Sequence, residues 1–421
     1  MSEWKTYKLG EIAEIIMGQS PAGETCNENG NGIPLLNGPT EFGSHYPTPV
    51  QFTIDAKKLS KVDDILFCVR GSTTGKMNWA DRQYAIGRGI ASIRHKNGKE
   101  YKHFLRGIID SNLKNILGIA TGSTFPNISG EQLREFEVLA PANLFEQRQI
   151  ASILSSLDDK IELNLQMNQT LEAMAQAIFK EWFVNFNYPM SESGFAGLKE
   201  EQDKNKTNKK SGKSSNPENQ DADNLVDGLP KGWRKEPIDK SIEFLNGLAL
   251  QGFPPESETG FLPVIKIREL RQGITDNSDR ASSEIPKQYI IIDGDILFSW
   301  SGSLEVVLWC DGKGALNQHL FKVSSKHFPK WFYYLWTKHF LPIYQSIASD
   351  KATTMGHIQR RHLTETIINV PNSEVMELAN NVISPIIQKL EENKIQIKTL
   401  TQLRDSLLPK LMTGEISLNT I

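Results

Sequence analysis

Two segments of the chain carry apolar residues that alternate in steps of four and three. The first segment runs from Ile150 to Trp182 and the second from Ala379 to Leu411, at a constant shift of 229 residues. This spacing puts the apolar side chains on one narrow stripe of a helix and is typical of a coiled-coil seam. A single helix of this kind usually packs on its own domain, but two equivalent helices favour mutual packing. At about 1.5 Å per residue, a helix of ~37 residues is roughly 55 Å long.

The two helices carry a polar residue at the same position of the predicted seam. Asn164 and Asn393 occupy equivalent places, and a buried Asn fixes the register of paired helices at a cost in stability. Antiparallel pairing would put the two preceding regions at opposite ends, related by a pseudo-twofold axis. Pro385 falls inside the second segment and either kinks that helix or marks its start. The residues predicted to form the seam or to bind partner proteins are Ile150, Leu154, Leu157, Ile161, Asn164, Leu171, Ile178, Ile383, Ile386, Leu390, Asn393, Ile397, Leu400 and Leu407.

The regions that precede the two helices match each other in order. Gly18 recurs as Gly247 at a shift of 229 residues, and the run Asp-Ile-Leu-Phe at 64–67 recurs at 295–298. In both regions, short runs of β-branched and aromatic residues alternate with Gly, Pro and Asn turns. Ordered matches at a nearly fixed offset indicate an internal duplication. We therefore predict an α+β protein with two similar domains of mixed helix and sheet, joined by two long helices that form an antiparallel coiled coil.

A polar stretch separates the two copies. Residues 199–228 contain only three apolar residues, one Ala, one Leu and one Val, and so bury too little surface to offset their ordering entropy. We interpret this stretch as part of a flexible linker. The predicted parts of the chain are a first mixed domain at 1–143, a first helix at 144–187, a flexible polar linker at 188–230, a second mixed domain at 231–372 and a second helix at 373–415.

Composition excludes several classes of protein. The 421 residues include 47 Lys and Arg and 50 Asp and Glu, a formal net charge of −3, which excludes a uniformly basic protein but not local basic patches. No apolar run approaches the ~18 residues of a membrane span, and the first residues lack the pattern of a secretory signal. Three cysteines without a Cys-x-x-Cys pair argue against a disulfide scaffold or a zinc ribbon. We expect a cytoplasmic protein without a metal site.

Charge is segregated along the chain. Residues 57–106 hold twelve basic and four acidic residues, and residues 312–363 of the second copy hold eight basic residues and one acidic residue. One basic run alone would be a solvated face, but equivalent patches in both copies indicate a polyanion bound at two places. Gly, Ser, Thr and cations alternate at 70–76, and such groups grip phosphates. A nucleic acid is therefore the expected partner. The aromatic cluster at 331–336 is interpreted as core rather than as a base-stacking platform.

Motifs for catalysis are mostly missing. A Gly-rich run that ends at Met77 is one residue too short for a phosphate-binding loop and lacks the Mg²⁺-binding hydroxyl. The alternative that we keep is a self-contained Mg²⁺-dependent nuclease, in which Asp295, Asp311 and Lys313 would hold the ion. The duplication argues against it, because Lys313 aligns with Gln83. A third interpretation is a coiled-coil adaptor whose basic patches bind no DNA.

Several motifs resemble those of a known family, the specificity subunits of type I restriction–modification systems. Residues 174–186 resemble the end of the first conserved helix of that family, and residues 407–416 the end of the second. Residues 229–233, Leu-Pro-Lys-Gly-Trp, resemble the usual opening of the second target-recognition domain. Residues 353–363 and 122–128 are also similar to family motifs. The resemblance covers the whole chain except the linker.

The resemblance implies a non-catalytic subunit that reads double-stranded DNA. Its two target-recognition domains would each bind one half of a bipartite, asymmetric site, and the paired helices would set the length of the gap between them. Two methyltransferase subunits and the restriction (translocase–endonuclease) subunits would be its protein partners. S-adenosylmethionine, ATP and Mg²⁺ would be bound by those partners, and this chain would hold no cofactor.

Recognition surfaces vary within the family, so the contact residues are chosen as polar residues near the aligned turns. The residues predicted to bind DNA in the first copy are Arg70, Ser72, Thr73, Lys76, Asn78, Arg88, Thr121 and Ser123. Those in the second copy are Lys266, Arg268, Arg271, Ser301, Ser303, Gln318, Lys351, Thr353 and Arg360. The change Arg268→Ala is expected to weaken binding to one half-site only, whereas an equal loss across unrelated sequences would make Arg268 a phosphate contact.

Overall fold

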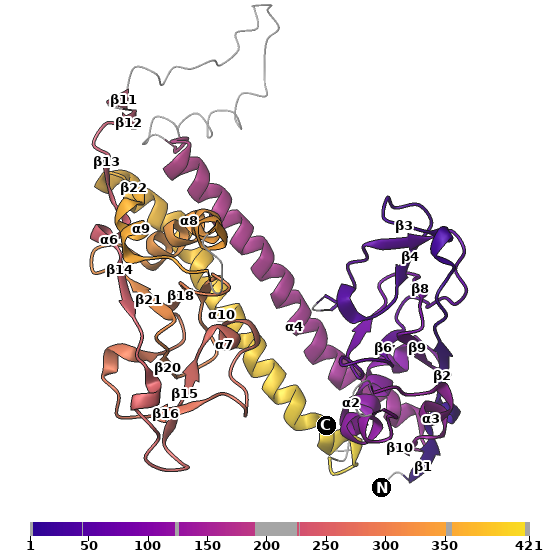
Figure 1. Cartoon of the computed structure of the whole chain (residues 1–421). Helices are drawn as coiled ribbons and strands as arrows, with labels where there is room; N and C mark the ends of the chain where they lie inside the picture. The colour runs from indigo at the N-terminus through magenta and orange to yellow at the C-terminus, as the bar shows by residue number, and fades with distance from the viewer. Residues whose placement is uncertain are drawn as a thin grey trace, which may run out of the picture. The chain divides into compact units, whose positions relative to one another are not determined.

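The computed structural model describes residues 3–43, 45–122, 126–189, 225–226, 228–350 and 356–416. Most of the predicted linker at 188–230 lies outside these described residues. The chain divides into two compact units, of which the first comprises Met1–Leu163 and Thr399–Ile421 and the second Asn164–Lys398. Each unit combines a sheet-containing domain with parts of two long helices, α4 (Leu144–Phe179) and α10 (Ser373–Met412) (Figure 1).

The domain of the first unit contains two four-stranded sheets. The antiparallel strands of one sheet, in spatial order, are β2 (Ala13–Met17), β9 (Ile90–His95), β6 (Ile65–Cys68) and β7 (Met77–Trp79). The strands of the other are β3 (Cys26–Asn27), β5 (Gln51–Thr53), β4 (Ile33–Leu36) and β8 (Ala85–Ile86), with β4 and β8 parallel. A separate antiparallel pair is formed by β1 (Trp4–Lys8) and β10 (Glu137–Pro141). The α-helices of this domain are α1 (Leu9–Ile12), α2 (Lys102–Gly118) and α3 (Gly130–Glu135), and the 3-10 helices are η1 (Gly23–Thr25), η2 (Pro39–Glu41) and η3 (Lys99–Tyr101).

The second unit repeats this arrangement. Its antiparallel sheet has the order β14 (Glu243–Asn246), β21 (Leu320–Ser324), β18 (Ile296–Ser299) and β19 (Val306–Leu308). Its other sheet has the order β16 (Arg280–Ser282), β15 (Phe261–Ile265), β20 (Gly314–Leu316) and β17 (Ile290–Ile291), with β15 and β20 parallel. Two further pairs are β13 (Arg234–Pro237) with β22 (Ile367–Val370), and β11 (Leu225–Val226) with β12 (Leu229–Pro230). The α-helices of this domain are α6 (Ile238–Ser241), α7 (Ile267–Gln272), α8 (Lys330–Asp350) and α9 (Arg360–Glu365), and the 3-10 helices are η6 (Leu250–Gly252) and η7 (Lys287–Tyr289).

The central strand β6 is buried along its whole length because both of its faces are covered. Successive side chains of a strand point to opposite faces. Ile65 and Phe67 belong to the core that includes α2, whereas Leu66 and Cys68 belong to a smaller core shared with the second sheet. The repeated run Asp-Ile-Leu-Phe is therefore a strand buried on two faces, and β18 has the same property. The structure confirms the predicted α+β class with two similar sheet-containing domains.

One backbone contact explains a glycine that recurs in both domains. A Cβ atom on Gly18 would lie 2.1 Å from the carbonyl oxygen of Gly87, and one on Gly247 would lie 2.2 Å from that of Asn317. Any larger residue would push apart the end of the first strand of the antiparallel sheet and the loop that passes it. The two glycines are therefore fixed by the same close approach.

Both long helices contribute to the core of each unit. In the first unit, Ile150 and Leu154 of α4 share a core with Leu411 of α10. In the second unit, Phe179 of α4 shares a core with Ile383 of α10. The first helix ends in a π-helical turn, Lys180–Val184. The second begins at Ser373, so Pro385 lies inside it and does not mark its start. The coiled coil along the full length of both helices stays a prediction. Among the helices of the described residues, none combines the length and apolarity that crossing a membrane requires.

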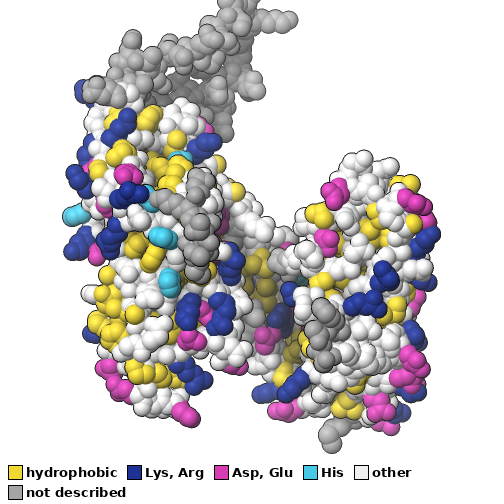
Figure 2. Space-filling model, in the orientation of Figure 1, with side chains coloured by type: hydrophobic (Ala, Val, Ile, Leu, Met, Phe, Trp, Pro, Cys, Tyr) yellow, Lys and Arg dark blue, Asp and Glu magenta, His cyan; other side chains and the backbone are white. Residues whose placement is uncertain are grey.

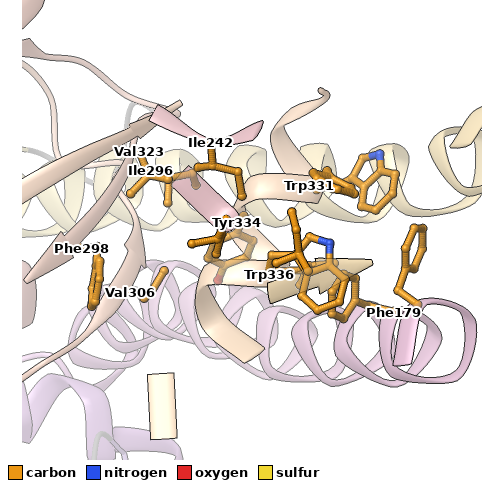
Figure 3. Close-up of a cluster of buried hydrophobic side chains, with 14 of the residues drawn as sticks. Phe179, Ile242, Ile296, Phe298, Val306, Val323, Trp331, Tyr334 and Trp336 are labelled. Atoms are coloured by element: carbon orange, nitrogen blue, oxygen red, sulfur yellow. The ribbon is translucent and has the colours of Figure 1, made fainter. Parts of the chain in front are cut away.

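Aromatic side chains attach the domain of the second unit to α4 (Figure 3). Trp331 and Trp336 of α8 are at most 2% exposed. The ring of Phe179 on α4 lies edge-on to Trp336, with centroids 4.9 Å apart. Such pairs add to the stabilisation from buried area. The interpretation of the cluster at 331–336 as core is confirmed.

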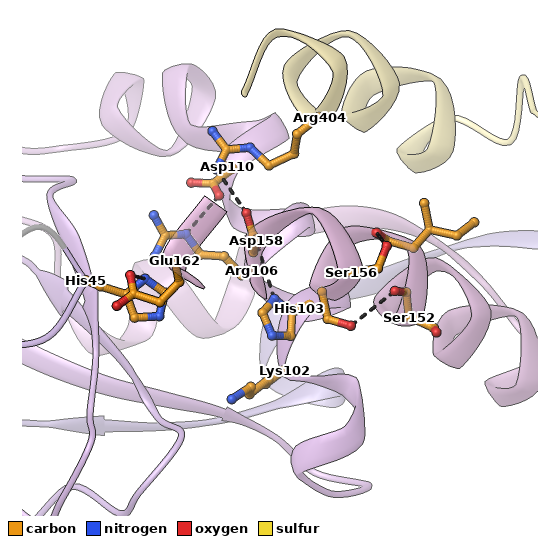
Figure 4. Close-up of polar contacts among 12 residues, drawn as sticks. His45, Lys102, His103, Arg106, Asp110, Ser152, Ser156, Asp158, Glu162 and Arg404 are labelled. Carbon is orange, nitrogen blue, oxygen red and sulfur yellow. Dashed lines mark hydrogen bonds and ion pairs between the residues drawn. The ribbon is translucent and has the colours of Figure 1, made fainter. Parts of the chain in front are cut away.

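A polar network occupies the corresponding position in the first unit (Figure 4). Asp158 of α4 lies 3.3 Å from Nδ1 of His103 on α2 and 3.0 Å from Nη1 of Arg404 on α10. Burial opposes the charge of Asp158, but the hydrogen bonds from His103 and Arg404 outweigh it and lower the pKa of the carboxyl. His103, Asp158 and Arg404 line a pocket of about 340 Å³. Arg106 and Asp110, which form an ion pair at 2.8 Å, line this pocket as well.

Candidate nucleic-acid interface

Three loops of the first domain meet at one end of its antiparallel sheet, where β6 ends and β9 begins. Gly71 donates a backbone hydrogen bond to Pro126, and Ile128 donates one to Val69, both at 2.9 Å. Val69 donates in turn to Gly89 at 2.9 Å. These bonds join the loop after β6, the loop before β9 and the segment before α3. The predicted DNA-contact residues on these loops are Arg70, Ser72, Thr73, Lys76, Arg88 and Thr121.

Three cations on this surface, Arg70, Lys76 and Arg88, are exposed. The Arg70 guanidinium donates a hydrogen bond from Nε to Oδ1 of Asn127 at 3.1 Å, which orients it. Among the residues that the structure describes, no acidic side chain forms an ion pair with any of the three. Their charge therefore stays available to attract phosphate groups.

Asn78, another predicted contact of the first domain, points inward. It is only 3% exposed. Its Nδ2 donates to the carbonyl oxygen of Gly43 at 3.0 Å, and its Oδ1 accepts from the backbone N–H of Trp79 at 2.8 Å. Both ends of the amide are therefore used inside the domain. The last predicted residue of this copy, Ser123, lies outside the described residues.

The second domain assembles the equivalent loops with the same backbone pattern. Gly302 donates to Gly356 at 2.9 Å, Ile358 donates to Trp300 at 3.0 Å, and Trp300 donates to His319 at 3.3 Å. The predicted DNA-contact residues on or beside these loops are Ser301, Ser303, Gln318 and Arg360. Figure 2 shows several His, Lys and Arg side chains on one face of the second unit. Two further predicted contacts, Lys351 and Thr353, lie outside the described residues.

These side chains differ in how they are held. Ser301 is 5% exposed, and its hydroxyl lies 3.0 Å from Nδ1 of His319. The guanidinium of Arg360 lies 6.0 Å from the ring centroid of Phe321, within reach of a cation–π interaction. Ser303 is exposed. Among the described predicted contacts, the second surface has one arginine, Arg360, which lies near an aromatic ring, whereas the first has three exposed cations.

The three predicted contacts on or next to α7 form ion pairs with acidic residues. Lys266 pairs with Asp279, and this contact lowers the pKa of the Asp279 carboxyl. Nη2 of Arg268 lies 2.7 Å from Oε1 of Glu269, whose side chain is fully buried. Arg271 pairs with Glu305, whose Oε1 lies 2.5 Å from Nε of Arg271. All three cations therefore neutralise acidic residues of their own domain.

Sequence reasoning missed Trp300 and His319. Trp300 is half-buried and donates from Nε1 to Oδ1 of Asn246 at 2.9 Å. Its ring centroid lies 5.8 Å from that of His319, which is exposed. At the repeat shift of 230 residues His319 aligns with Gly89, so the first copy offers no polar counterpart that would draw attention to it. A search for polar residues present in one copy alone would have found it.

The two acids of the nuclease alternative form ion pairs with different lysine residues. Asp295 accepts the backbone N–H of Ile292 at 2.9 Å and pairs with Lys322 at 2.7 Å. Asp311 pairs instead with Lys398 at 3.2 Å. Within the described part of the chain, no group of three or more His, Cys, Asp and Glu residues is placed to hold a metal ion. Both acids thus stabilise local structure.

Comparison with known proteins shows which family the chain is similar to. A family model described as the type I restriction modification DNA specificity domain matches residues 1–173 and 230–405. The chain is 24% identical to the type I restriction enzyme MjaIX specificity subunit of Methanocaldococcus jannaschii, over 98% of this chain and 94% of that protein. It is also 24% identical to the type I restriction enzyme HindI specificity subunit of Haemophilus influenzae, over 99% of this chain and the whole of that protein.

A solved structure shares the fold. The S subunit of a type I restriction–modification system from M. genitalium superposes with a TM-score of 0.58 at 16% sequence identity, over 97% of this chain and 96% of that one. The identity is low, so this likeness concerns the fold and not the residues of the interface.

Proposed function

Because this chain belongs to the family of type I restriction–modification DNA specificity subunits, we propose that its two domains each bind one half of a bipartite, asymmetric DNA site. Specificity subunits are the non-catalytic, DNA-reading components of restriction–modification complexes. In this proposal residues 1–143 and 231–372 are target-recognition domains. Residues 144–187 and 373–415 are spacer helices, which set the gap between the two half-sites.

One observation supports the asymmetry of the site. The two domains form the same loop cluster with the same backbone hydrogen bonds, but the side chains differ. The bridge between Arg70 and Asn127 in the first domain corresponds to the bridge between Ser301 and His357 in the second. Base edges are read by the hydrogen-bonding groups of side chains. Two equally built surfaces with different side chains are suited to two different half-sites.

We also propose that two methyltransferase subunits and the restriction subunits bind this chain in the cytoplasm. Those subunits would supply the S-adenosylmethionine, ATP and Mg²⁺ of the complex. Phe145, Leu163 and Met174 are between 47% and 61% exposed on α4, and exposed apolar side chains on a long helix favour a protein partner. The predicted seam residues, which are less exposed, would instead hold the two helices together.

The test is a map of adenine methylation in the source strain, with and without this gene. Loss of one bipartite, asymmetric motif on deletion, and its return on complementation, is the expected result. An unchanged map in a strain whose partner subunits are expressed and active would contradict the proposal. Complementation with a chain whose first domain is exchanged should change only one half of the motif.

A further inference from the structure

We infer that Gln318 and His319 form a base-reading pair of the second domain, with His319 as a specificity-determining residue. This inference rests on the proposed function, because it assigns a role within the second half-site. The two residues lie on the loop before β21, and His319 contacts the predicted contact residue Ser301. Three features carry the inference: how the imidazole is held, how the backbone is fixed, and how the first domain differs.

The imidazole of His319 is exposed but held in place. Its Nδ1 lies 3.0 Å from the hydroxyl of Ser301, which is 5% exposed. The indole of Trp300 lies next to the imidazole, with the ring centroids 5.8 Å apart and the ring planes tilted by 40°. An exposed side chain without such partners samples several rotamers, and fixing it on binding costs free energy. Here the surroundings fix the ring before any ligand arrives, as in a preorganised binding site.

The backbone of Gln318 is fixed as well. Its N–H donates to the carbonyl oxygen of Leu248 at 2.9 Å, and its own carbonyl oxygen accepts from Nε1 of Trp300 at 3.1 Å. The side-chain Nε2 of Gln318 lies 3.5 Å from Nε2 of His319. This is the outer limit of a hydrogen bond, so the contact between the two side chains is weak.

The chemistry of the pair suits the edges of bases. A Gln amide offers one donor and one acceptor side by side, the pattern that pairs with N6 and N7 of adenine. With Nδ1 of His319 occupied by Ser301, Nε2 is the nitrogen left for a ligand. When Nδ1 accepts the serine proton, Nε2 is a donor that suits N7 or O6 of a purine. In the other tautomer it is an acceptor that suits an exocyclic amine.

The first domain lacks this pair at the same backbone position. Val69 donates to Gly89 in the first domain as Trp300 donates to His319 in the second. The position that presents an imidazole in one domain therefore presents no side chain in the other. Arg88 occupies the place of Gln318. A substitution at this position can therefore change the sequence preference of one domain without changing the fold that both domains share.

The test selects bound DNA from a library randomised over both half-sites, using the full-length chain with its methyltransferase partner. Wild type should define a bipartite motif. His319→Ala should reduce the preference at one or two adjacent positions of the second half by roughly tenfold, the size of one lost base contact. Ser301→Ala, which removes only the positioning hydroxyl, should give a smaller loss at the same positions. Neither variant should alter the first half.

The matched control is His327→Ala, because His327 is an exposed His just after the other end of β21. It should leave the whole motif unchanged. An unchanged motif for His319→Ala, or a uniform loss of binding with unchanged preferences, would overturn the inference, provided that the variant melts at the wild-type temperature. If the variant melts lower, His319→Gln replaces it under the same criteria. A wild-type chain that selects no bipartite motif would refute the proposed function itself.

Discussion

Asn164 of α4 donates a hydrogen bond from Nδ2 to Oε1 of Gln396 on α10 at 2.8 Å. Asn164 is completely buried, and Asn393, the equivalent residue of the second helix, is 1% exposed. Among the described residues, neither Oδ1 of Asn164 nor Nδ2 of Asn393 has a hydrogen-bond partner. A buried polar group without a partner costs free energy. These two residues therefore lower stability and, through the bond that is made, favour one register of the helices.

The change Asn164→Leu should stabilise the chain. It removes a buried polar atom without a partner, and exposed Gln396 can hydrogen-bond to water instead. We expect a gain of about 1–3 kcal/mol in the free energy of unfolding, measured by chemical denaturation. Asn168→Leu tests a second buried Asn of the same helix, which also has an Oδ1 without a partner. A lower stability for Asn164→Leu would mean that the bond to Gln396 outweighs the burial cost.

The polar network at Asp158 predicts that removing one of its members lowers the stability of the first unit. Arg404→Ala removes one of the two groups that offset the charge of Asp158. We expect a loss of about 1–3 kcal/mol, the usual cost of breaking a hydrogen bond to a charged group. Lys410→Ala, at an exposed position of the same helix, should change stability by less than ~0.5 kcal/mol. Equal effects of the two changes would show that the network does not hold α10 to this domain.

A buried histidine predicts how stability depends on pH. His95 is 5% exposed, and burial lowers its pKa to about 4. In the unfolded chain a His titrates near ~6.5, so the unfolded state takes up the proton first as the pH falls. The contribution of neutral His95 to the free energy of unfolding is therefore fully present above about pH 6.5 and is lost as the pH falls towards 4. After allowance for solvent screening, we expect this loss to be about 2 kcal/mol. The measurement is the melting temperature between pH 7 and 4.5.

His95→Phe supplies the control for this pH dependence. Phe keeps the stacking on Tyr101, whose ring centroid lies 4.7 Å from that of His95, but it cannot take up a proton. The variant should therefore lose less stability than wild type over the same pH range. Parallel pH profiles for the two proteins would show that other groups cause the acid loss.

The structure changes what we expect of Arg268→Ala. Glu269 is buried. Its partners are Arg268, the backbone N–H of Lys266, which donates at 3.1 Å, and the hydroxyl of Ser278, which donates at 3.0 Å. Without Arg268 a buried carboxylate loses its cation, so the main effect should be a lower melting temperature. The double variant Arg268→Ala/Glu269→Gln should recover part of the loss, because the charge is removed along with its partner. If Arg268→Ala keeps the wild-type melting temperature but no longer recognises the second half-site, the result would instead support the DNA contact that the sequence predicts.

The sequence predicts the fold well where burial alone decides. The strands at 65–68 and 296–299 follow from apolar runs, and the long helices follow from their spacing. The interface is harder to predict because the orientation of its side chains depends on groups that are distant in the sequence. Asn78 is turned inward by the carbonyl oxygen of Gly43. His319 is oriented by Ser301, 18 residues away. No local pattern reports such pairings.

Two arginines of the first domain are expected to play different parts in DNA binding. Arg70 is oriented by the side chain of Asn127 at 3.1 Å, whereas no hydrogen bond or ion pair of the Arg88 side chain occurs among the described residues. An oriented guanidinium suits a base edge, and a mobile one suits a phosphate. Arg88→Ala should weaken binding equally for all sequences and reduce the slope of log K against log salt by about one. Arg70→Ala should instead relax the first half-site at one position, by roughly fivefold or more.

Binding titrations at several salt concentrations, with the preferred site and with a site altered in its first half, separate these two roles. Asn127→Ala provides the matched variant, because it removes the partner that orients Arg70 and leaves both cations in place. It should lower discrimination in the first half while the salt slope stays unchanged. A lower slope for Arg70→Ala with unchanged discrimination would make Arg70 a phosphate contact, and the orientation by Asn127 would then serve the fold of the loop rather than the reading of bases.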